Sequence, residues 1–252
     1  MLASCTSTGS SGTSATAGTA SPAQGACGGT TATLSGALAV ITDPIGCPGG
    51  VNTYYSEQLR PLGVTWTAPR FIAYRDGQIP QDACGAKDPQ AADFESNAFY
   101  CRLDDTVAYS SDFLGLLDAK GGPTYPMFVL MHELGHRATT LTHRTGAVSR
   151  SEENQADCLA GAESRFTHDA GRTGTFNIVK GGYLFFSLGD SGGKWFGDEP
   201  STAPDAHGTP RERAEAFALG YFKGINECWK VGASQDGTLP DISLSLLKSL
   251  FG

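Results

Sequence analysis

Hydrophobic and polar positions divide the chain into a low-complexity N-terminal part and a longer part with regular periodicity. Residues 1–26 are rich in Ser, Thr, Gly and Ala and show no apolar periodicity, so we expect them to be disordered. Residues 28–39 have a similar Gly/Thr/Ala-rich composition and predict a loosely held segment. The pattern predicts a tether over residues 1–49 and one folded domain over residues 50–252, which the chain length also fits.

The apolar pattern after residue 50 predicts mainly helices with a small sheet. Predicted helices cover residues 51–60, 113–119, 125–140, 151–167, 209–228 and 241–251, and predicted strands cover 70–75 and 106–109. The segment Thr209–Glu212 is a capping box with proline at the first helical position. Residues 181–196 are Gly-rich with aromatics and predict irregular structure or a short helix near 179–187. The predicted fold class is therefore α+β, mostly helical.

Within the predicted helix 125–140, His132, Glu133 and His136 form an H-E-x-x-H sequence. The preceding residues 125–131 are apolar, so this helix is expected to be buried. Residues four apart share a helix face, so the two imidazoles point at one place with Glu133 beside them. Buried imidazoles and a buried carboxylate need partners, and a zinc ion would serve all three. The alternative is two surface histidines with a glutamate between them.

A zinc ion that catalyses hydrolysis needs three protein ligands and one open position. One pattern supplies a third histidine in the sequence H-E-x-x-H-x-x-G-x-x-H. The chain has Thr139 and Thr142 where that pattern needs glycine and histidine, and His143 comes one residue too late. We therefore expect His143 on the surface, together with His168, because both lie in polar surroundings.

A carboxylate from the following predicted helix is the other source of a third ligand. Glu153 and Asp157 are four residues apart and share a helix face. Glu153 would then bind the ion while Asp157 accepts the second N–H of His132. Glu152 is the rival ligand, on a different face. The same sequence also suits an acidic first helical turn with Ser151 as N-cap, and the two interpretations are compatible.

With these motifs in order, the chain resembles a family of predicted bacterial neutral zinc metallopeptidases. The matching segments span roughly residues 50–230, and they are 69–74, 83–85, 98–101, the H-E-x-x-H sequence, 153–158 and 207–209. Residues 155–161 after H-E-x-x-H are more specific than H-E-x-x-H alone. The resemblance implies a zincin-like fold of the gluzincin type, zinc as cofactor and Glu153 as third ligand, without indicating a substrate. The linker between His136 and Glu153 is shorter than in the family.

The resemblance also suggests two further roles. In zincin-like folds a strand lies over the zinc and pairs with an extended substrate, and strand 106–109 is either that strand or an ordinary sheet strand. Hydrolysis at zinc creates an oxyanion, which a second donor stabilises besides the metal. His207 is our candidate for this donor, with a structural hydrogen bond near the helix start as the alternative. Tyr183 and Tyr221 are weaker candidates.

The chain has seven cysteines, none in a C-x-x-C pair, which disfavours a cysteine-ligated zinc site. Among many possible pairings, the order of elements favours the disulfides Cys27–Cys47, Cys84–Cys101 and Cys158–Cys228. The second of these also matches the family pattern, and the third would fix the helix that carries Glu153. Disulfides indicate an extracellular or cell-envelope location.

Cys5 is the remaining cysteine. The segment Leu2–Cys5 matches the end of a bacterial lipoprotein signal, whose cysteine is lipidated after cleavage, and a tether-like Ser/Thr/Gly/Ala tract follows. The charged and apolar parts of such a signal are missing, so we expect the native start to lie further upstream. The alternative is a disordered tail with a chance cysteine.

The net charge of −8 at pH 7 disfavours nucleic acid as a partner, because its phosphates would be repelled. The chain contains no run of about 18 apolar residues that would span a membrane. Contact with a membrane is therefore expected only through a lipid at Cys5.

We hypothesise a zinc metallopeptidase of the bacterial cell envelope that acts on peptide or protein substrates. His132, His136 and Glu153 would bind the zinc, and Glu133 would take a proton from the attacking water and deliver it to the leaving amine. The alternative is a non-catalytic envelope module with a structural zinc and a partner protein in its cleft. An intact Glu133 favours the enzyme, whereas a closed fourth coordination position would favour the module.

Overall fold

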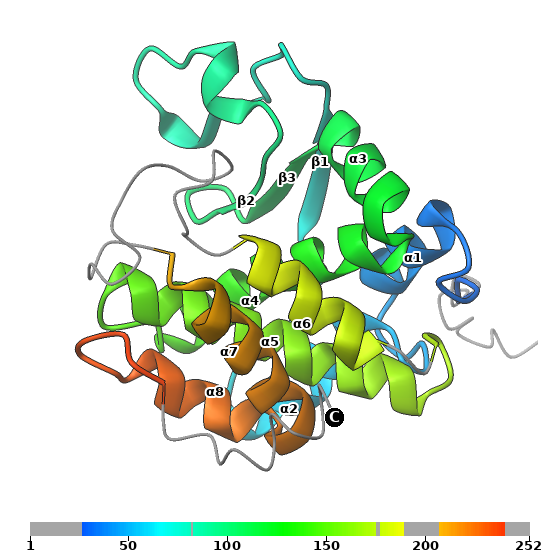
Figure 1. Ribbon diagram of the computed structural model, residues 1–252, viewed down its shortest axis with the longest axis vertical. Helices are drawn as coiled ribbons and strands as arrows, with labels where there is room; N and C mark the ends of the chain where they lie inside the picture. The colour runs from blue at the N-terminus through cyan, green and yellow to red at the C-terminus, as the bar shows by residue number, and fades with distance from the viewer. Residues whose placement is uncertain (1–26, 82, 175–176, 189–206, 240–252) are drawn as a thin grey trace, which may run out of the picture.

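The computed structural model describes residues 27–81, 83–174, 177–188 and 207–239 (Figure 1). In this part the chain has an α+β fold, mostly helical with one three-stranded sheet, which confirms the predicted fold class in its coarse form. Cys5 and the predicted helix 241–251 lie outside the described residues. No helix in the described part is long and apolar enough to cross a membrane.

Most of the helices lie close to their predicted positions, but the first of them was not predicted. They are α1 (Leu34–Thr42), α2 (Val51–Leu59), α3 (Ser111–Gly121), α4 (Thr124–Thr142), α5 (Ser149–Asp169), α6 (Asn177–Leu188), α7 (Pro210–Lys223) and α8 (Ile225–Gly232). The prediction of one helix over 209–228 was wrong, because Gly224, with a φ of 78°, separates α7 from α8. The capping box at the start of α7 is confirmed. Ser151 is not an N-cap, because α5 begins two residues earlier with Val148 in that position.

Helix α5 is the centre of the helical part and contacts α4, α6, α7 and α8 (Figure 1). Two glycines allow α5 and α7 to meet backbone against backbone. A Cβ added to Gly220 would lie 1.7 Å from the carbonyl oxygen of Cys158, and one added to Gly161 would lie 1.9 Å from that of Phe217. The disulfide Cys158–Cys228, with a Cα–Cα distance of 5.3 Å, ties α5 to α8 as predicted. The helix that carries Glu153 is therefore fixed on several sides.

The sheet lies beside α3 and α4 (Figure 1) and consists of β1 (Arg70–Tyr74), β2 (Ala98–Cys101) and β3 (Thr106–Ser110). The strand order is β1-β3-β2, with β1 parallel and β2 antiparallel to β3. Both edges of β3 are thus paired, so the predicted strand 106–109 cannot itself pair with an extended substrate. Strand β2, which the apolar pattern did not predict, is an edge strand and packs on α4. The predicted disulfide Cys84–Cys101 is confirmed and holds the end of β2.

The segment before α2 is packed on the core, so the prediction of a loosely held segment at 28–39 was wrong. Ala37, Val40 and Ile41 of α1 are fully buried in the main hydrophobic core. The sequence signal was weak because Gly, Thr and Ala dominate this stretch, and only the apolar residues after Gly36 make the inward face. Residues 27–49 are therefore part of the folded domain rather than of a tether.

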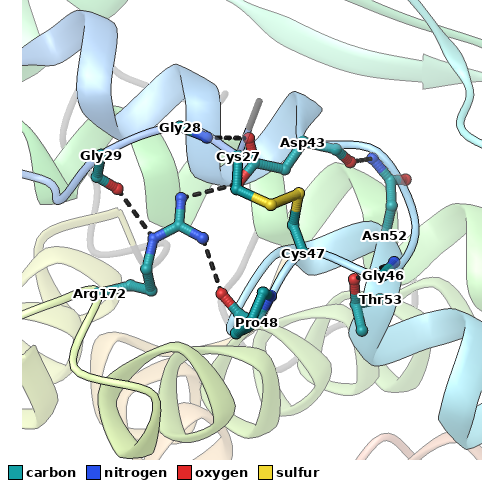
Figure 2. Close-up of a disulfide and its surroundings, with 10 residues drawn as sticks. All are labelled: Cys27, Gly28, Gly29, Asp43, Gly46, Cys47, Pro48, Asn52, Thr53 and Arg172. Carbon is teal, nitrogen blue, oxygen red and sulfur yellow. Dashed lines mark hydrogen bonds and ion pairs between the residues drawn. A yellow bond between two sulfur atoms is a disulfide. The ribbon is translucent and has the colours of Figure 1, made fainter. Parts of the chain in front are cut away.

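Figure 2 shows how this N-terminal segment is held by the predicted disulfide Cys27–Cys47 and by Arg172. Arg172, which follows α5, donates to the backbone oxygens of Gly29 and Pro48, each at 2.8 Å. It also forms a buried ion pair with Asp43 at 2.7 Å, and the second oxygen of Asp43 accepts from the backbone N–H of Gly28. One arginine thus binds backbone oxygens on both sides of α1.

Replacing Arg172 with methionine is expected to lower the free energy of unfolding by about 3 kcal/mol, because Asp43 would be left as a buried, unpaired carboxylate. Denaturant unfolding followed by circular dichroism measures this. The matched control is Arg165→Met, since Arg165 forms an exposed ion pair with Asp169 and should contribute less than about 1 kcal/mol. Equal losses in the two variants would show that Arg172 does not hold the segment.

A second buried carboxyl group, Glu163 of α5, has no part in the predicted chemistry. Its side chain is fully buried, one oxygen accepts from the Tyr55 hydroxyl, and the other has no hydrogen-bond partner among the described residues. Burial raises the pKa of Glu163 well above its ordinary value, although the Tyr55 hydrogen bond and His132 lower it. Glu163 is therefore protonated in the folded protein at pH values where it ionises in the unfolded chain.

This pKa difference makes the protein less stable as the pH rises above the ordinary value of a glutamate. The folded state then binds more protons than the unfolded state. The free energy of unfolding therefore falls by about 1.4 kcal/mol per pH unit while Glu163 stays protonated. Glu163→Gln should remove that dependence. The free energy of unfolding of this variant should therefore rise relative to that of the wild type between about pH 5 and about pH 8. Urea unfolding at both pH values measures it, with the exposed Glu57→Gln as control. Parallel pH dependences for wild type and Glu163→Gln would contradict this assignment.

Candidate metal centre

One face of α4 carries the predicted site. Val129, His132, Glu133 and His136 recur at the i, i+3, i+4 and i+7 positions of a helix face and line a cavity of about 630 Å³. Strand β2, α3, α5, α6 and the start of α7 also contribute to its lining. The apolar run before His132 is buried, as the sequence predicted.

Helix α5 brings a carboxylate to the two imidazoles. Gly135 lies against Ala156, where an added Cβ would come within 3.1 Å of the backbone of α5, so small residues set the close spacing of α4 and α5. Glu153 is thereby placed 3.2 Å from Nε2 of His132 and 3.4 Å from Nε2 of His136. The two Nε2 atoms are 3.0 Å apart. These three residues form a group that could bind a metal ion.

The electrostatics of Glu153 suit a ligand. Burial alone would raise the pKa of Glu153, but His136 and His132 together hold it well below its ordinary value. The carboxyl group is therefore an anion, as metal binding requires. Both imidazole Nε2 atoms face the oxygens of one carboxylate, so the three side chains converge on one place suited to a cation.

Behind His132 lies a buried chain of charged groups. Asp157 approaches Nδ1 of His132 at 2.7 Å, which leaves Nε2 for the metal position. Arg213 of α7 binds both oxygens of Asp157, with Nε at 2.6 Å and Nη2 at 2.8 Å. Burial alone would raise the pKa of Asp157, but Arg213 and His132 hold it below its ordinary value. The orientation of His132 thus depends on α5 and α7 together.

Glu133 is held by the edge strand. The backbone N–H of Tyr100 in β2 donates to Oε2 of Glu133 at 2.9 Å. Burial raises the pKa of Glu133 above its ordinary value, against the lowering effect of His132. A carboxylate with a raised pKa beside a candidate metal position suits both the acceptance and the return of a proton.

Glu152, the rival ligand, lies closer to the site than the sequence predicted. It was expected on a different face of the helix, yet it lines the same cavity, with its carboxylate 3.4 Å from Nδ1 of His136. Its other contact is an ion pair with Arg102, which follows β2. The group that could bind a metal ion contains Glu153 and not Glu152. The carboxylate of Glu152 therefore lies on the Nδ1 side of the His136 ring, away from the place where the two Nε2 atoms and Glu153 converge.

Of the other candidate residues, the structure places His207 at the cavity and the remaining ones elsewhere. His207 lines the cavity, whereas Tyr183 is exposed and Tyr221 is buried, and neither is among the residues that line it. His143 is exposed as predicted. His168 was also expected on the surface but is half-buried, with its ring 6.4 Å from that of Tyr221.

Three contributors to the site gave no usable signal in the sequence. Arg213 is an ordinary polar position within a predicted helix, and Arg102 follows a strand that the apolar pattern did not predict. The third is the backbone N–H of Tyr100, a group that every residue except proline carries. The capping box at Thr209 fixes the start of α7, and hence the position of Arg213 along that helix. Only the tertiary contacts identify these groups as parts of the site.

Comparison with known proteins assigns no activity. Protein-family models give no match to the chain, and no solved structure matches it. Uncharacterized proteins of Mycobacterium bovis and of two strains of Mycobacterium tuberculosis are similar to it, each 29% identical over 116 residues. The matched region covers 40% of this chain and 37% of each relative, so the chain spans well under half the length of these relatives.

Replacing Arg213 with methionine is expected to weaken metal binding by about 10- to 100-fold, because Asp157 would lose the partner that fixes it against His132. Arg213→Lys should recover only part of that loss, since lysine cannot form the two parallel hydrogen bonds. Competition with a chromophoric chelator measures the affinity. Arg211→Met on the same helix is the matched control, because Arg211 is exposed and forms an ion pair with Glu215, away from the candidate ligands. Identical metal affinities in the Arg213→Met and Arg211→Met variants would contradict the role of Arg213 in fixing Asp157 against His132.

Proposed function

We propose that this protein is a zinc-dependent peptidase in which His132, His136 and Glu153 hold the metal. The observation that carries the proposal is the close approach of the three side chains: the two Nε2 atoms are 3.0 Å apart, and they lie 3.2 and 3.4 Å from the two carboxylate oxygens of Glu153. A tetrahedral zinc with nitrogen and oxygen ligands at about 2.0–2.1 Å has ligands about 3.3 Å from one another. Two imidazoles and one carboxylate are also a donor set found in catalytic zinc sites, which leave one position open.

Bound zinc would supply a water of lowered pKa and would polarise the carbonyl of a substrate. The remaining work falls to residues of this chain. Glu133 takes a proton from the attacking water and returns it to the leaving amine, and the Tyr100 N–H keeps its carboxylate in position. His207 in the cavity lining is the candidate donor for the oxyanion.

A peptide substrate is favoured by the edge strand at the cavity. Residues 97–100, which include most of β2, line the cavity, and β2 is paired on one side only within the described part. An extended peptide can add to such an edge through backbone hydrogen bonds. This gives β2 the substrate-pairing role that the sequence suggested for strand 106–109.

The fold and location that we propose rest on the same features. The H-E-x-x-H helix, the following helix with Glu153 and the edge strand support a zincin-like fold of the gluzincin type and the resemblance to neutral zinc metallopeptidases. Three disulfides are compatible with an extracellular location. A cell-envelope protein anchored by a lipid at Cys5 is our proposal for the native form.

Zinc content and peptide cleavage test the proposal. The purified 252-residue chain should contain about one zinc per chain by elemental analysis and should cleave members of a proteome-derived peptide library. A chelator should abolish cleavage, and added zinc should restore it. Zinc binding without any cleavage would favour the non-catalytic module, and absence of bound metal after zinc loading would refute the metal site.

A further inference from the structure

Charged side chains tie the turn between β2 and β3, residues 102–105, to neighbouring elements. Arg102 pairs with a glutamate of α5 and Asp104 with an arginine of β1, and the arginine of each pair is exposed. Asp105 pairs with Arg137 of α4, whose side chain is only 1% exposed. Among these three ion pairs, the one made by Asp105 therefore reaches into the core.

The side chain of Arg137 is fixed on every side of its guanidinium group. Its Nε and Nη2 atoms donate to the two oxygens of Asp105 at 2.6 and 2.7 Å. Its Nη1 atom donates to the backbone oxygen of Thr67 at 2.7 Å, and the group lies 4.1 Å from the centre of the buried Trp66 ring. Two parallel hydrogen bonds from a planar group set both the distance and the orientation of the carboxylate. The turn is thus held at a fixed place on α4.

The same hairpin meets α4 at a second point through Tyr100 of β2. Its backbone N–H donates to Glu133 at 2.9 Å, and its hydroxyl donates to Asp105 at 3.1 Å. Burial and the Asp105 carboxylate raise the pKa of Tyr100 to about 12, so the hydroxyl keeps its proton at neutral pH. Glu133 and Arg137 are four residues apart, about 6 Å along one face of α4. The hairpin is therefore attached at two points of the helix face that carries the candidate metal centre.

The two attachments differ in what the proposed reaction asks of them. Glu133 takes up a proton and returns it, and a hydrogen bond to a carboxylate weakens when that carboxylate is protonated. A guanidinium keeps its charge in proteins, so the attachment through Arg137 persists through both proton transfers. Strand β2 therefore has one attachment that changes during the reaction and one that does not.

We infer that Arg137, acting through Asp105, is a positioning residue that holds strand β2 in register with the candidate metal centre. The inference rests on the proposed peptidase function, in which β2 pairs with the substrate. A displacement of about 1 Å at a reacting group can cost about 100-fold in rate. Loss of this attachment should therefore lower kcat/KM by about 10- to 100-fold. Zinc should stay bound, because Arg137 and Asp105 lie outside the group of candidate ligands.

Substitutions on both sides of the ion pair test the inference. Asp105→Asn keeps the shape of the side chain but loses its charge and one acceptor oxygen, so kcat/KM on a library-derived peptide should show that fall. Asp105→Glu restores a carboxylate and should recover part of the loss. Arg137→Lys keeps the charge without the two parallel hydrogen bonds, and its loss should not add to that of Asp105→Asn in the double variant. Chelator competition should give wild-type zinc affinity, and circular dichroism checks that each variant is folded at the assay temperature.

Asp104→Asn is the matched control on the same turn. It breaks the ion pair with the exposed Arg70, which should contribute little, so kcat/KM should stay unchanged. Hydrogen exchange of the Tyr100 amide, followed by NMR on the tyrosine-labelled chain without substrate, gives a measurement that needs no turnover. This amide should exchange about tenfold faster in Asp105→Asn than in the wild type, and at the wild-type rate in Asp104→Asn.

The outcomes separate this inference from the proposed function. Wild-type cleavage by Asp105→Asn, or equal losses in Asp105→Asn and Asp104→Asn, would overturn the positioning role and leave the peptidase intact. Loss of zinc from Asp105→Asn would also overturn it, because the effect would then act through the metal ligands. If the zinc-loaded wild type cleaves nothing, the peptidase fails and the Tyr100 amide decides. Faster exchange in Asp105→Asn alone would support the attachment of β2 through Arg137, and equal exchange in all variants would overturn it.

Discussion

Glu133→Gln is expected to lower kcat by about 10²- to 10⁴-fold while zinc stays bound. Glutamine has the shape of glutamate and can still accept the Tyr100 N–H, so the geometry of the cavity should be kept. It cannot take a proton from the attacking water, which is the step assigned to Glu133. Cleavage rates on a library-derived peptide, together with zinc content by elemental analysis, measure both parts of the expectation.

The exposed Glu57→Gln on α2 is the matched control and should cleave at the wild-type rate. Full activity of Glu133→Gln would refute Glu133 as the general base. Loss of zinc along with activity would instead show that Glu133 contributes to metal binding, a result that the position of its carboxylate on the Tyr100 N–H does not predict.

Glu153→Ala is expected to weaken zinc binding by more than about 100-fold, a larger loss than the removal of an outer partner of a ligand causes. Two imidazoles alone would remain, and structural and catalytic zinc sites have at least three protein ligands. Equilibrium dialysis against a chelator of known affinity measures the change. Cleavage should fall in parallel at zinc concentrations that saturate the wild type.

The adjacent Glu152→Ala provides the comparison that decides between the two candidate ligands. Glu152 faces Nδ1 of His136 and pairs with Arg102, so its loss should weaken zinc binding by no more than about tenfold, as for a group behind the ligand. The reverse order, with zinc lost from Glu152→Ala and kept by Glu153→Ala, would assign the third ligand to Glu152.

Parts of the site that depend on local spacing could be predicted from the sequence. The i, i+4 spacing of His132 and His136 sets their common direction on any helix, and the same spacing joins Glu153 to Asp157 on the next one. The capping box at Thr209 likewise acts within one helical turn. Each of these relations involves residues fewer than five positions apart, where helix geometry alone decides which side chains meet.

Parts that depend on distant contacts could not be predicted. Arg213 reaches Asp157 across 56 residues of sequence, and nothing near Arg213 distinguishes it from the exposed Arg211. Strand β2 is four residues long and its strand character comes from pairing with β3. Helix α1 has a Gly/Thr/Ala-rich approach and gains its order from burial and from Arg172. In each case the deciding interaction is tertiary.

The disulfide between Cys27 and Cys47 also decides how the molecule responds to a pull on its N-terminus. Tension applied at residue 27 passes through the covalent bond to residue 47, directly before α2, and bypasses the intervening chain. Helix α1 lies wholly within the bypassed stretch and bears no load while that bond is intact. Reduction would redirect the load through α1 and the Arg172 contacts, so mechanical strength at this end of the molecule depends on an oxidising environment.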